Sequence, residues 1–557
     1  MKKIIFSLLI VLIISGCSKF LEEDNKGGIS NEDFYSTVVG YQTLMTASYA
    51  ALRTSYGQQL PRLLLLGTDL YQEGKGGAGS NLGLYEYANL YPSDEAVTQF
   101  YNNCYKAIQT INTALYYNGF PKGMSDAARN SSKAELRFLR AFYHFILVEQ
   151  FGGVTINDQI TLEPRMNMPR NTLADCYEFI ISEIEESIND LDMNTVARVN
   201  QDVANHYLAK IYLTRGWDLG NDNDFTKAKT YAQKVISGKG PITLTYESLW
   251  DPDNENNSEI IFAIQYDNSS IASTSSGNTQ QAAFGAYMGG SENHQKIMSG
   301  TNPSWSLHSW YAENDARYGA SFMLMSYENY FDYYTVADKS SLKIRAYYPR
   351  VWGRDYTTAE LNAWKATHTL ATPFLYFPWV EPEDVYRDVI AWDKDFGNPT
   401  IKKFDSPASR EYGVVSSSAS VRDIVLARLA ETYFLYAEAC IGLNDFATAA
   451  SYVQQVLNRP GNALTGTLTN TIGSSPDRQE ALHRYLIESG KEFIGEYNGR
   501  WPELRRTGML EYMLEKYNYD IKQQAEVDFN IYKLRPIPED AIILNEGINE
   551  EDQNPGY

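Results

Sequence analysis

The chain of 557 residues is 43% hydrophobic, which is ample for a large core, and its formal net charge is −21. That charge repels nucleic acid and anionic lipid head groups, so nucleic-acid binding is disfavoured. Aromatic content is high at 13%, with 42 Tyr and 9 Trp, as suits wet recognition surfaces or a Tyr-rich helical core. The four cysteines form no CxxC motif and no Cys/His cluster, so we expect no zinc site, no redox motif and no cofactor.

Residues 1–16 have the features of a secretory leader. Two lysines precede an apolar run, which ends in small residues and is too short to span a membrane. Ile14-Ser15-Gly16-Cys17 resembles the bacterial lipobox, in which the cysteine becomes the lipidated N-terminus after cleavage. The acidic residues 22–24 resemble the surface-export signal of lipoproteins in some Gram-negative bacteria. We therefore expect a signal peptide over 1–16, a lipid on Cys17, a linker over 17–30, and anchoring at the outer-membrane surface.

Helical patterns begin soon after the linker. They are expected over residues 31–54, 94–118, 133–154 and 172–192, and several open on N-cap residue types. The segment 133–154 is apolar on two faces and is therefore predicted to be a buried helix. Its remaining polar stripe contains Arg137, Arg140 and His144, and buried cations need partners. A carboxylate on a neighbouring helix is the favoured partner, and a bound ligand is the alternative.

Two helical pairs resemble each other. One lies in residues 203–238 and the other in 427–459, each with small residues where the two helices would cross, as in tetratricopeptide repeats. Between the pairs regularity fades, except for a strand-like run from Glu259 to Tyr266. Residues 67–92 are also irregular and rich in Gly and Tyr. Long irregular stretches on a rigid scaffold are where binding residues concentrate.

Several motifs together resemble the SusD/RagB family. They are Ala134-Glu135 with Arg137, Arg140-Ala141 and Phe151-Gly152; Leu249-Trp250; Ser258 to Phe262; Leu307 with Asp315 and Arg317; Arg428 to Glu431 and Tyr436 to Ala439; Lys491 to Phe493; Arg500-Trp501 with Leu504 and Arg506; and Gln553 to Tyr557. Ser489 and Glu503 stand where the family commonly has Arg and Asp.

The resemblance implies a mostly α fold, a right-handed superhelix of tetratricopeptide-like helix pairs with a large irregular, loop-rich half. One SusD-like domain would span 31–557, with its scaffold at about 31–239 and 422–557 and its ligand region at about 240–421. The implied role is a surface lipoprotein that binds oligosaccharide or polysaccharide and delivers it to a SusC-like TonB-dependent transporter. The Arg137 stripe would then hold helices together.

Flat aromatic platforms on loops suit sugars, whose C–H faces stack on rings while their hydroxyls need polar partners. Six candidates are Trp305, Tyr287, Tyr85, Tyr71, Trp352 and Trp310, of which Trp310 adjoins a core position of the family and has packing as its alternative. For any one of them, a buried ring beneath the loops is the alternative.

The sequence supports a catalytic function less well than a binding function. A glycosidase needs two facing carboxylates, and Glu381, Glu383 and Asp384, or Asp393 and Asp395, are conceivable pairs. Solvated loop charges explain them better in a chain with 69 acidic residues. The sequence lacks HExxH, GxSxG, a phosphate-binding loop and EF-hand spacing, so we expect neither an enzyme nor a metal site. Peptide binding on the same scaffold, as in RagB-like proteins, is the alternative function.

Overall fold

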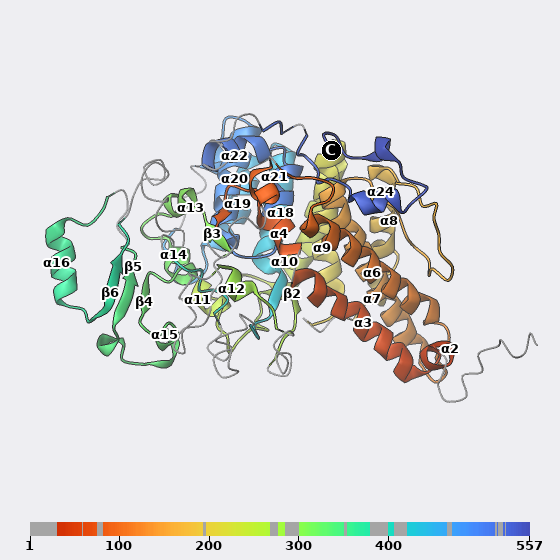
Figure 1. The fold of residues 1–557 in the computed structure, drawn as a ribbon, viewed down its shortest axis with the longest axis horizontal. Helices are drawn as coiled ribbons and strands as arrows, with labels where there is room; N and C mark the ends of the chain where they lie inside the picture. Colours follow the sequence, from red (N-terminus) through yellow and green to blue (C-terminus); the bar gives the residue numbers. More distant parts are fainter. Residues whose placement is uncertain are drawn as a thin grey trace, which may run out of the picture.

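The computed structural model describes most of the chain from Asn31 onward, and the scaffold is helical (Figure 1). The described residues are 31–57, 60–74, 82–87, 89–192, 197–267, 277–284, 300–349, 354–378, 399–405, 420–464, 471–518, 521, 527–529 and 531–557. No helix within these ranges is both long enough and apolar enough to cross a bilayer.

The long helices of the scaffold pack in consecutive pairs. These helices are α3 (Val38–Tyr56), α6 (Glu95–Tyr117), α7 (Asp126–Phe151), α8 (Leu173–Glu185), α9 (Gln201–Leu219), α10 (Asp222–Lys239), α18 (Leu429–Gly442), α19 (Phe446–Leu457) and α20 (Arg478–Phe493). α3 packs on α6, α7 on α8, α9 on α10, and α18 on α19. Successive pairs meet through α6 and α7, α8 and α9, and α10 and α18. The predicted mostly helical, tetratricopeptide-like architecture is confirmed.

Shorter helices complete the scaffold: α2 (Asn31–Tyr35), α4 (Leu60–Leu65), α5 (Leu82–Glu86), η3 (Ile188–Asp190), η9 (Ile472–Ser474), α21 (Arg500–Arg506), α22 (Leu510–Tyr517), α24 (Glu539–Ile543) and η10 (Glu550–Asp552). Most long helices start at a side chain that accepts a hydrogen bond from a first-turn amide, as Asp94, Thr172 and Asn200 do. Such caps satisfy amides that have no partner within the helix.

Small residues allow the helix pairs to approach closely. The ring of Phe225, on α10, lies between Gly216 of α9 and Gly442 of α18. A Cβ atom at either glycine would come within 2.9 Å of that ring. The side chains of Ala228 and Ala449, at the predicted crossing points, are also fully buried. The repeat pattern read from the sequence therefore marks the true helix contacts.

Three predicted helical segments differ from the structure, one of them because α8 ends at Glu185 and not at residue 192. The segment 31–54 is divided into α2 and α3, because Thr37 caps a new helix by accepting a hydrogen bond from the amide of Gly40. The central helix α7 starts at Asp126, not at Lys133, because Ser125 caps it. Its last residue is Phe151, and the C-cap Gly152 has a φ of 74°, which favours glycine.

The polar stripe of α7 is paired within the protein. Arg137 binds Glu183 of α8 at 2.9 Å, and Arg140 binds the same carboxylate at 2.6 Å. His144 Nε2 accepts a hydrogen bond from the Asn157 amide at 3.2 Å, and burial lowers the pKa of His144 to about 4. The structural interpretation of this stripe is therefore confirmed.

The irregular half consists of short helices and three small sheets: β1 (Tyr71–Glu73), α11 (Tyr246–Leu249), β2 (Ile260–Ile264), α12 (Gln280–Phe284), β3 (Thr301–Pro303), α13 (Trp305–Trp310), α14 (Ala316–Ser321), β4 (Met325–Tyr327), α15 (Asp332–Thr335), η5 (Lys339–Ser341), β5 (Ile344–Tyr347), α16 (Thr358–Ala366), β6 (Leu370–Tyr376) and β7 (Ile424–Arg428). The sheet orders are β1-β3, β2-β7 and β4-β5-β6. The predicted strand is β2, which pairs antiparallel with β7. The sheet β4-β5-β6 and α16 form a lobe at one end of the molecule (Figure 1).

A buried ionic network joins the irregular half to α20. Glu492 is fully buried and accepts hydrogen bonds from Arg428 Nη1 at 3.0 Å and Arg317 Nη1 at 3.3 Å. A third guanidinium, that of Arg459, lies 3.4 Å from the same carboxylate. Although burial alone would raise the pKa of Glu492, the three cations, led by Arg428, lower it to about 2. Because Arg317 lies on α14, the network ties the loop-rich half to the scaffold.

Candidate functional site

The two irregular stretches predicted to bind ligand meet at the β1-β3 ladder. Tyr71 pairs with Pro303 in this ladder, and the Gly74 amide donates to the Gly300 carbonyl at 3.4 Å. Tyr85, on α5, donates its hydroxyl to the same carbonyl at 3.0 Å. These hydrogen bonds join segments that lie more than 200 residues apart in the chain. We call this region the β1-β3 corner.

Three predicted platform residues lie at this corner, and all three are buried. Trp305, the first residue of α13, is 8% exposed, Tyr85 is 3% exposed and Tyr71 is 1% exposed. The Tyr71 hydroxyl accepts a hydrogen bond from the Gly495 amide at 2.8 Å, and burial raises its pKa. In this structure none of the three offers a free ring face, so they support the loops from beneath. Ligand contact by these rings stays a prediction.

Trp310 lies at the other end of α13 and is half-buried. Its ring packs edge-on against Tyr517 with 4.9 Å between centroids. The other two candidates, Tyr287 and Trp352, lie outside the described residues. So do the acidic residues considered for catalysis: Glu381, Glu383, Asp384, Asp393 and Asp395.

The lobe carries an aromatic stack that was not among the predicted sites. The indole of Trp364, on α16, lies parallel to the ring of Tyr347, on β5, with centroids 4.0 Å apart and an interplanar angle of 2°. His368, which is exposed, stacks on Trp364 at 4.2 Å and 18°. We call these three residues the lobe stack. His368 lies two residues beyond the end of α16, and its imidazole hydrogen-bonds to the Trp364 carbonyl at 2.8 Å.

Hydroxyl groups border the lobe stack. The hydroxyls of Tyr347 and Tyr356 lie 2.9 Å apart, and Tyr376 donates its hydroxyl to Asp355. Burial is the first cause of the raised pKa of Tyr347, so its hydroxyl stays protonated at neutral pH. Flat rings beside neutral hydroxyls and a carboxylate match the mixed apolar and polar surface of a sugar.

A separate groove of about 1090 Å³ runs along α3. Its other walls are the start of α7, residues 197–199 and β2. Inside it, the Tyr49 hydroxyl donates to Glu135, which also binds Arg198 Nε at 2.8 Å. These groups satisfy one another, so the groove offers an apolar floor with few unpaired polar groups. We therefore rank it below the aromatic sites.

Two buried carboxylates, Asp405 and Asp423, have clearly raised pKa values. Burial raises the pKa of Asp405 to about 6, and Tyr330 donates to this carboxylate at 2.7 Å. Burial likewise raises the pKa of Asp423 to about 7, and this group accepts from the Tyr266 amide at 2.7 Å. A catalytic acid must also reach its substrate. Both carboxylates are enclosed by protein donors, as structural groups are.

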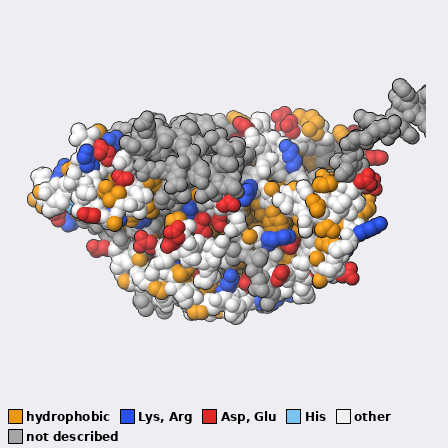
Figure 2. Space-filling view, turned by 90° about the horizontal axis from the view of Figure 1, so that it is seen from below, with side chains coloured by type: hydrophobic (Ala, Val, Ile, Leu, Met, Phe, Trp, Pro, Cys, Tyr) orange, Lys and Arg blue, Asp and Glu red, His pale blue; other side chains and the backbone are white. Residues whose placement is uncertain are grey.

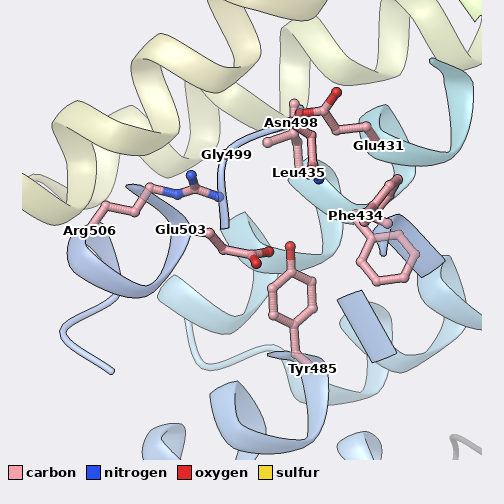
Figure 3. Close-up of a pocket in the computed structure, with 9 residues that line it drawn as sticks. Glu431, Phe434, Leu435, Tyr485, Asn498, Gly499, Glu503 and Arg506 are labelled. Atoms are coloured by element: carbon pink, nitrogen blue, oxygen red, sulfur yellow. The ribbon is translucent and has the colours of Figure 1, made fainter. Parts of the chain in front are cut away.

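A small cavity between α18, α20 and α21 contains further carboxylates (Figure 3). Its volume is about 10 Å³, room for one water at most. Glu503 points toward Tyr485 in this cavity, and Ser489 Oγ donates to Glu503 Oε1 at 2.7 Å. The two positions that depart from the family pattern thus contact each other. Ser489 and Glu503 therefore replace one polar pair of the family pattern by another. The cavity beside them is too small for a sugar.

Metal binding has little support in the described part of the chain. Nowhere in it do three His, Cys, Asp or Glu side chains group as metal ligands would. Cys104, Cys176 and Cys440 are free and buried, as expected of small apolar side chains.

A tetratricopeptide-like scaffold that carries an aromatic, loop-built half defines a class of binding protein. Residues 258–557, more than half of the chain, match the SusD family. Residues 19–213 match a family described as starch-binding, associating with the outer membrane. The protein therefore belongs to the SusD family.

One curated relative matches along the whole chain, and another matches part of it. SusD-like protein P2 of Formosa agariphila is 25% identical over 570 residues, covering 100% of this chain and 99% of that protein. The starch-binding protein SusD of Bacteroides thetaiotaomicron is 30% identical over 159 residues, 27% of this chain and 28% of that protein.

Solved structures confirm the fold. A SusD homologue from Bacteroides thetaiotaomicron has a TM-score of 0.72 at 17% identity, covering 96% of this chain and 100% of that one. A laminarin-binding SusD-like protein has a TM-score of 0.66 at 20% identity, covering 94% of this chain and 100% of that one.

Proposed function

We propose that this SusD-family protein binds neutral oligosaccharide or polysaccharide at its loop-rich half and does not cleave it. The observation that carries the proposal is the convergence of both irregular stretches at the β1-β3 corner of a SusD-family scaffold. Relatives named for starch and laminarin binding support a neutral glucan-like ligand. The net charge of −21 disfavours anionic polysaccharides.

The ligand contacts we propose come from two groups. Trp364 of the lobe stack is the platform among described residues, because its indole is half-buried and, besides the packed ring of Tyr347, is stacked by the exposed imidazole of His368. Trp310 at the end of α13 is a second proposed contact, and Tyr287 and Trp352, which lie outside the described residues, stay proposed contacts from the sequence. The buried rings of Trp305, Tyr85 and Tyr71 hold that corner in shape.

Absence of cleavage is part of the proposal. The buried carboxylates Asp405 and Asp423 accept hydrogen bonds from protein donors, and the relatives are named as binding proteins.

We expect protein starting at Ser18 to be retarded in native gels that contain starch or laminarin, and to leave the polysaccharide length unchanged. Reducing-end assays on the same mixtures provide the check for cleavage. New reducing ends would favour a glycosidase instead. Retardation or titration heat seen only with peptides would favour the RagB-like alternative.

We further propose that Cys17 carries a lipid that holds the protein on the outer-membrane surface, beside a SusC-like TonB-dependent transporter. Mass spectrometry of the N-terminal peptide from isolated outer membranes is expected to show acylated Cys17. Mild detergent extraction is expected to recover the transporter with the protein. A Cys17→Ala chain should lose acylation and membrane retention. An unmodified, membrane-retained Cys17→Ala chain would contradict the anchor.

A further inference from the structure

Aromatic side chains cover the end of the scaffold where the described chain begins. Phe34 and Tyr35 lie at the end of α2, and Tyr116, Tyr117 and Phe120 lie at or beyond the end of α6. Ring centroids are 5.4 Å apart for Tyr35 and Tyr117, and also for Tyr116 and Phe120. We define the tip patch as these rings together with the neighbouring side chain of α3: Phe34, Tyr35, Val39, Tyr116, Tyr117 and Phe120.

The tip patch faces solvent. Val39 is 66% exposed, Tyr116 is 44% exposed and Phe120 is 41% exposed. Single exposed apolar residues are normal, but a contiguous aromatic cluster marks an interaction surface. The patch is far from the lobe, since α2 and α16 lie at opposite ends of the long axis (Figure 1). Hydrophobic side chains are also visible among charged ones toward the right-hand end of the molecule in Figure 2.

We infer that the tip patch lies against the outer surface of the lipid membrane, at head-group depth. This inference rests on the proposed lipid at Cys17. Cys17 precedes Asn31 by 14 positions in the sequence, so an extended tether reaches at most about 50 Å. A tether of this kind holds the patch near the surface at an effective concentration of the order of millimolar, so a weak contact suffices. Tyr rings suit head-group depth because they join an apolar body to a polar hydroxyl.

Charges of both signs lie beside the tip patch. Glu32 and Asp33 are exposed on α2, directly beside Phe34, and Lys122 is exposed two positions after Phe120. An anionic lipid surface repels the chain as a whole, whose net charge is −21. The rings therefore make the contact, and charge attraction does not. Contact at this end places the lobe with α16 on the side of the protein that faces away from the membrane. Glycan reaches the protein from that side.

Gly119 provides a probe position within the patch. A side chain built there meets no atom within 4 Å. Gly119→Cys, labelled with an environment-sensitive fluorophore, should show a blue-shifted emission when the mature, lipidated protein is reconstituted in phosphatidylcholine–phosphatidylethanolamine vesicles. The matched control is Ala363→Cys, which is exposed on α16 at the far end and should show no shift. The described native cysteines are buried, which protects them from labelling.

Surface variants test the patch itself. Val39→Ser, Tyr116→Ser and Phe120→Ser combined should abolish the shift. A matched variant, Leu162→Ser with Ile543→Ser, removes side chains that are 73% and 69% exposed elsewhere and should keep it. Adding phosphatidylglycerol to the vesicles should reduce the shift.

The outcomes separate this inference from the proposed function. Acylated Cys17 with no shift at residue 119, or equal loss in both surface variants, overturns the membrane contact while glycan retardation stands. A shift that appears only when the transporter is reconstituted too would make the patch a protein interface and overturn the inference. A Cys17 without lipid would instead overturn the proposed anchor.

Discussion

Replacing Glu492 by glutamine is expected to lower the free energy of unfolding by about 3–5 kcal/mol. The carboxylate is fully buried and faces the guanidinium groups of Arg317, Arg428 and Arg459. A neutral amide leaves those cations with one negative charge fewer in a site that excludes water, and buried charge without compensation is strongly destabilising. Urea denaturation followed by far-ultraviolet circular dichroism measures the change.

The same variant should alter the acid dependence of stability. Glu492 has a pKa of about 2 in the folded protein against a reference value of 4.5. A depressed folded pKa contributes stability that is complete above the unfolded pKa and lost as the pH falls toward 2. Glu492→Gln should therefore lose less stability than the parent between pH 5 and pH 2. Glu511→Gln, an exposed residue on α22, is the control and should change stability by no more than about 0.5 kcal/mol. Equal unfolding midpoints for Glu492→Gln and this control would contradict the role of the network.

The helical scaffold was predictable because its signals are local. N-cap residues, apolar periodicity and small residues at helix crossings each act within a few turns, and Thr172 and Ala449 illustrate them. Pairing of the buried cations of α7 with a carboxylate was also predictable, since buried cations need partners of opposite charge. The particular partner, Glu183, was not, because that pairing depends on how α7 and α8 pack.

The exposure of individual aromatic rings was much less predictable. Tyr71 and Tyr85 lie in a Gly-rich stretch that resembles an open loop, yet pairing of β1 with β3 buries both rings. The lobe stack joins Tyr347 to Trp364 across 17 positions and two different elements. Local composition cannot tell which face of a ring is covered when the covering residue comes from another element.

Replacing Trp364 by alanine is expected to weaken glycan binding at least about tenfold, or about 1.4 kcal/mol. The indole is the largest aromatic ring system among the described side chains of the lobe, and Tyr347 stacks against it. A pre-ordered ring loses little entropy when a sugar stacks on it, so its contribution to affinity is large. Affinity gels or calorimetry with the best-bound neutral polysaccharide measure the loss.

His368 provides the matched variant, because its imidazole covers the face of Trp364 that lies opposite Tyr347. His368→Ala should leave affinity unchanged or increase it, since it uncovers that face of the indole for a sugar ring. Because His368 is exposed, its removal has little effect on folding. A loss equal to that of Trp364→Ala would make the imidazole itself a contact. Unchanged affinity in both variants would rule out the lobe stack as the platform and leave Trp310, Tyr287 and Trp352 as the residues to test.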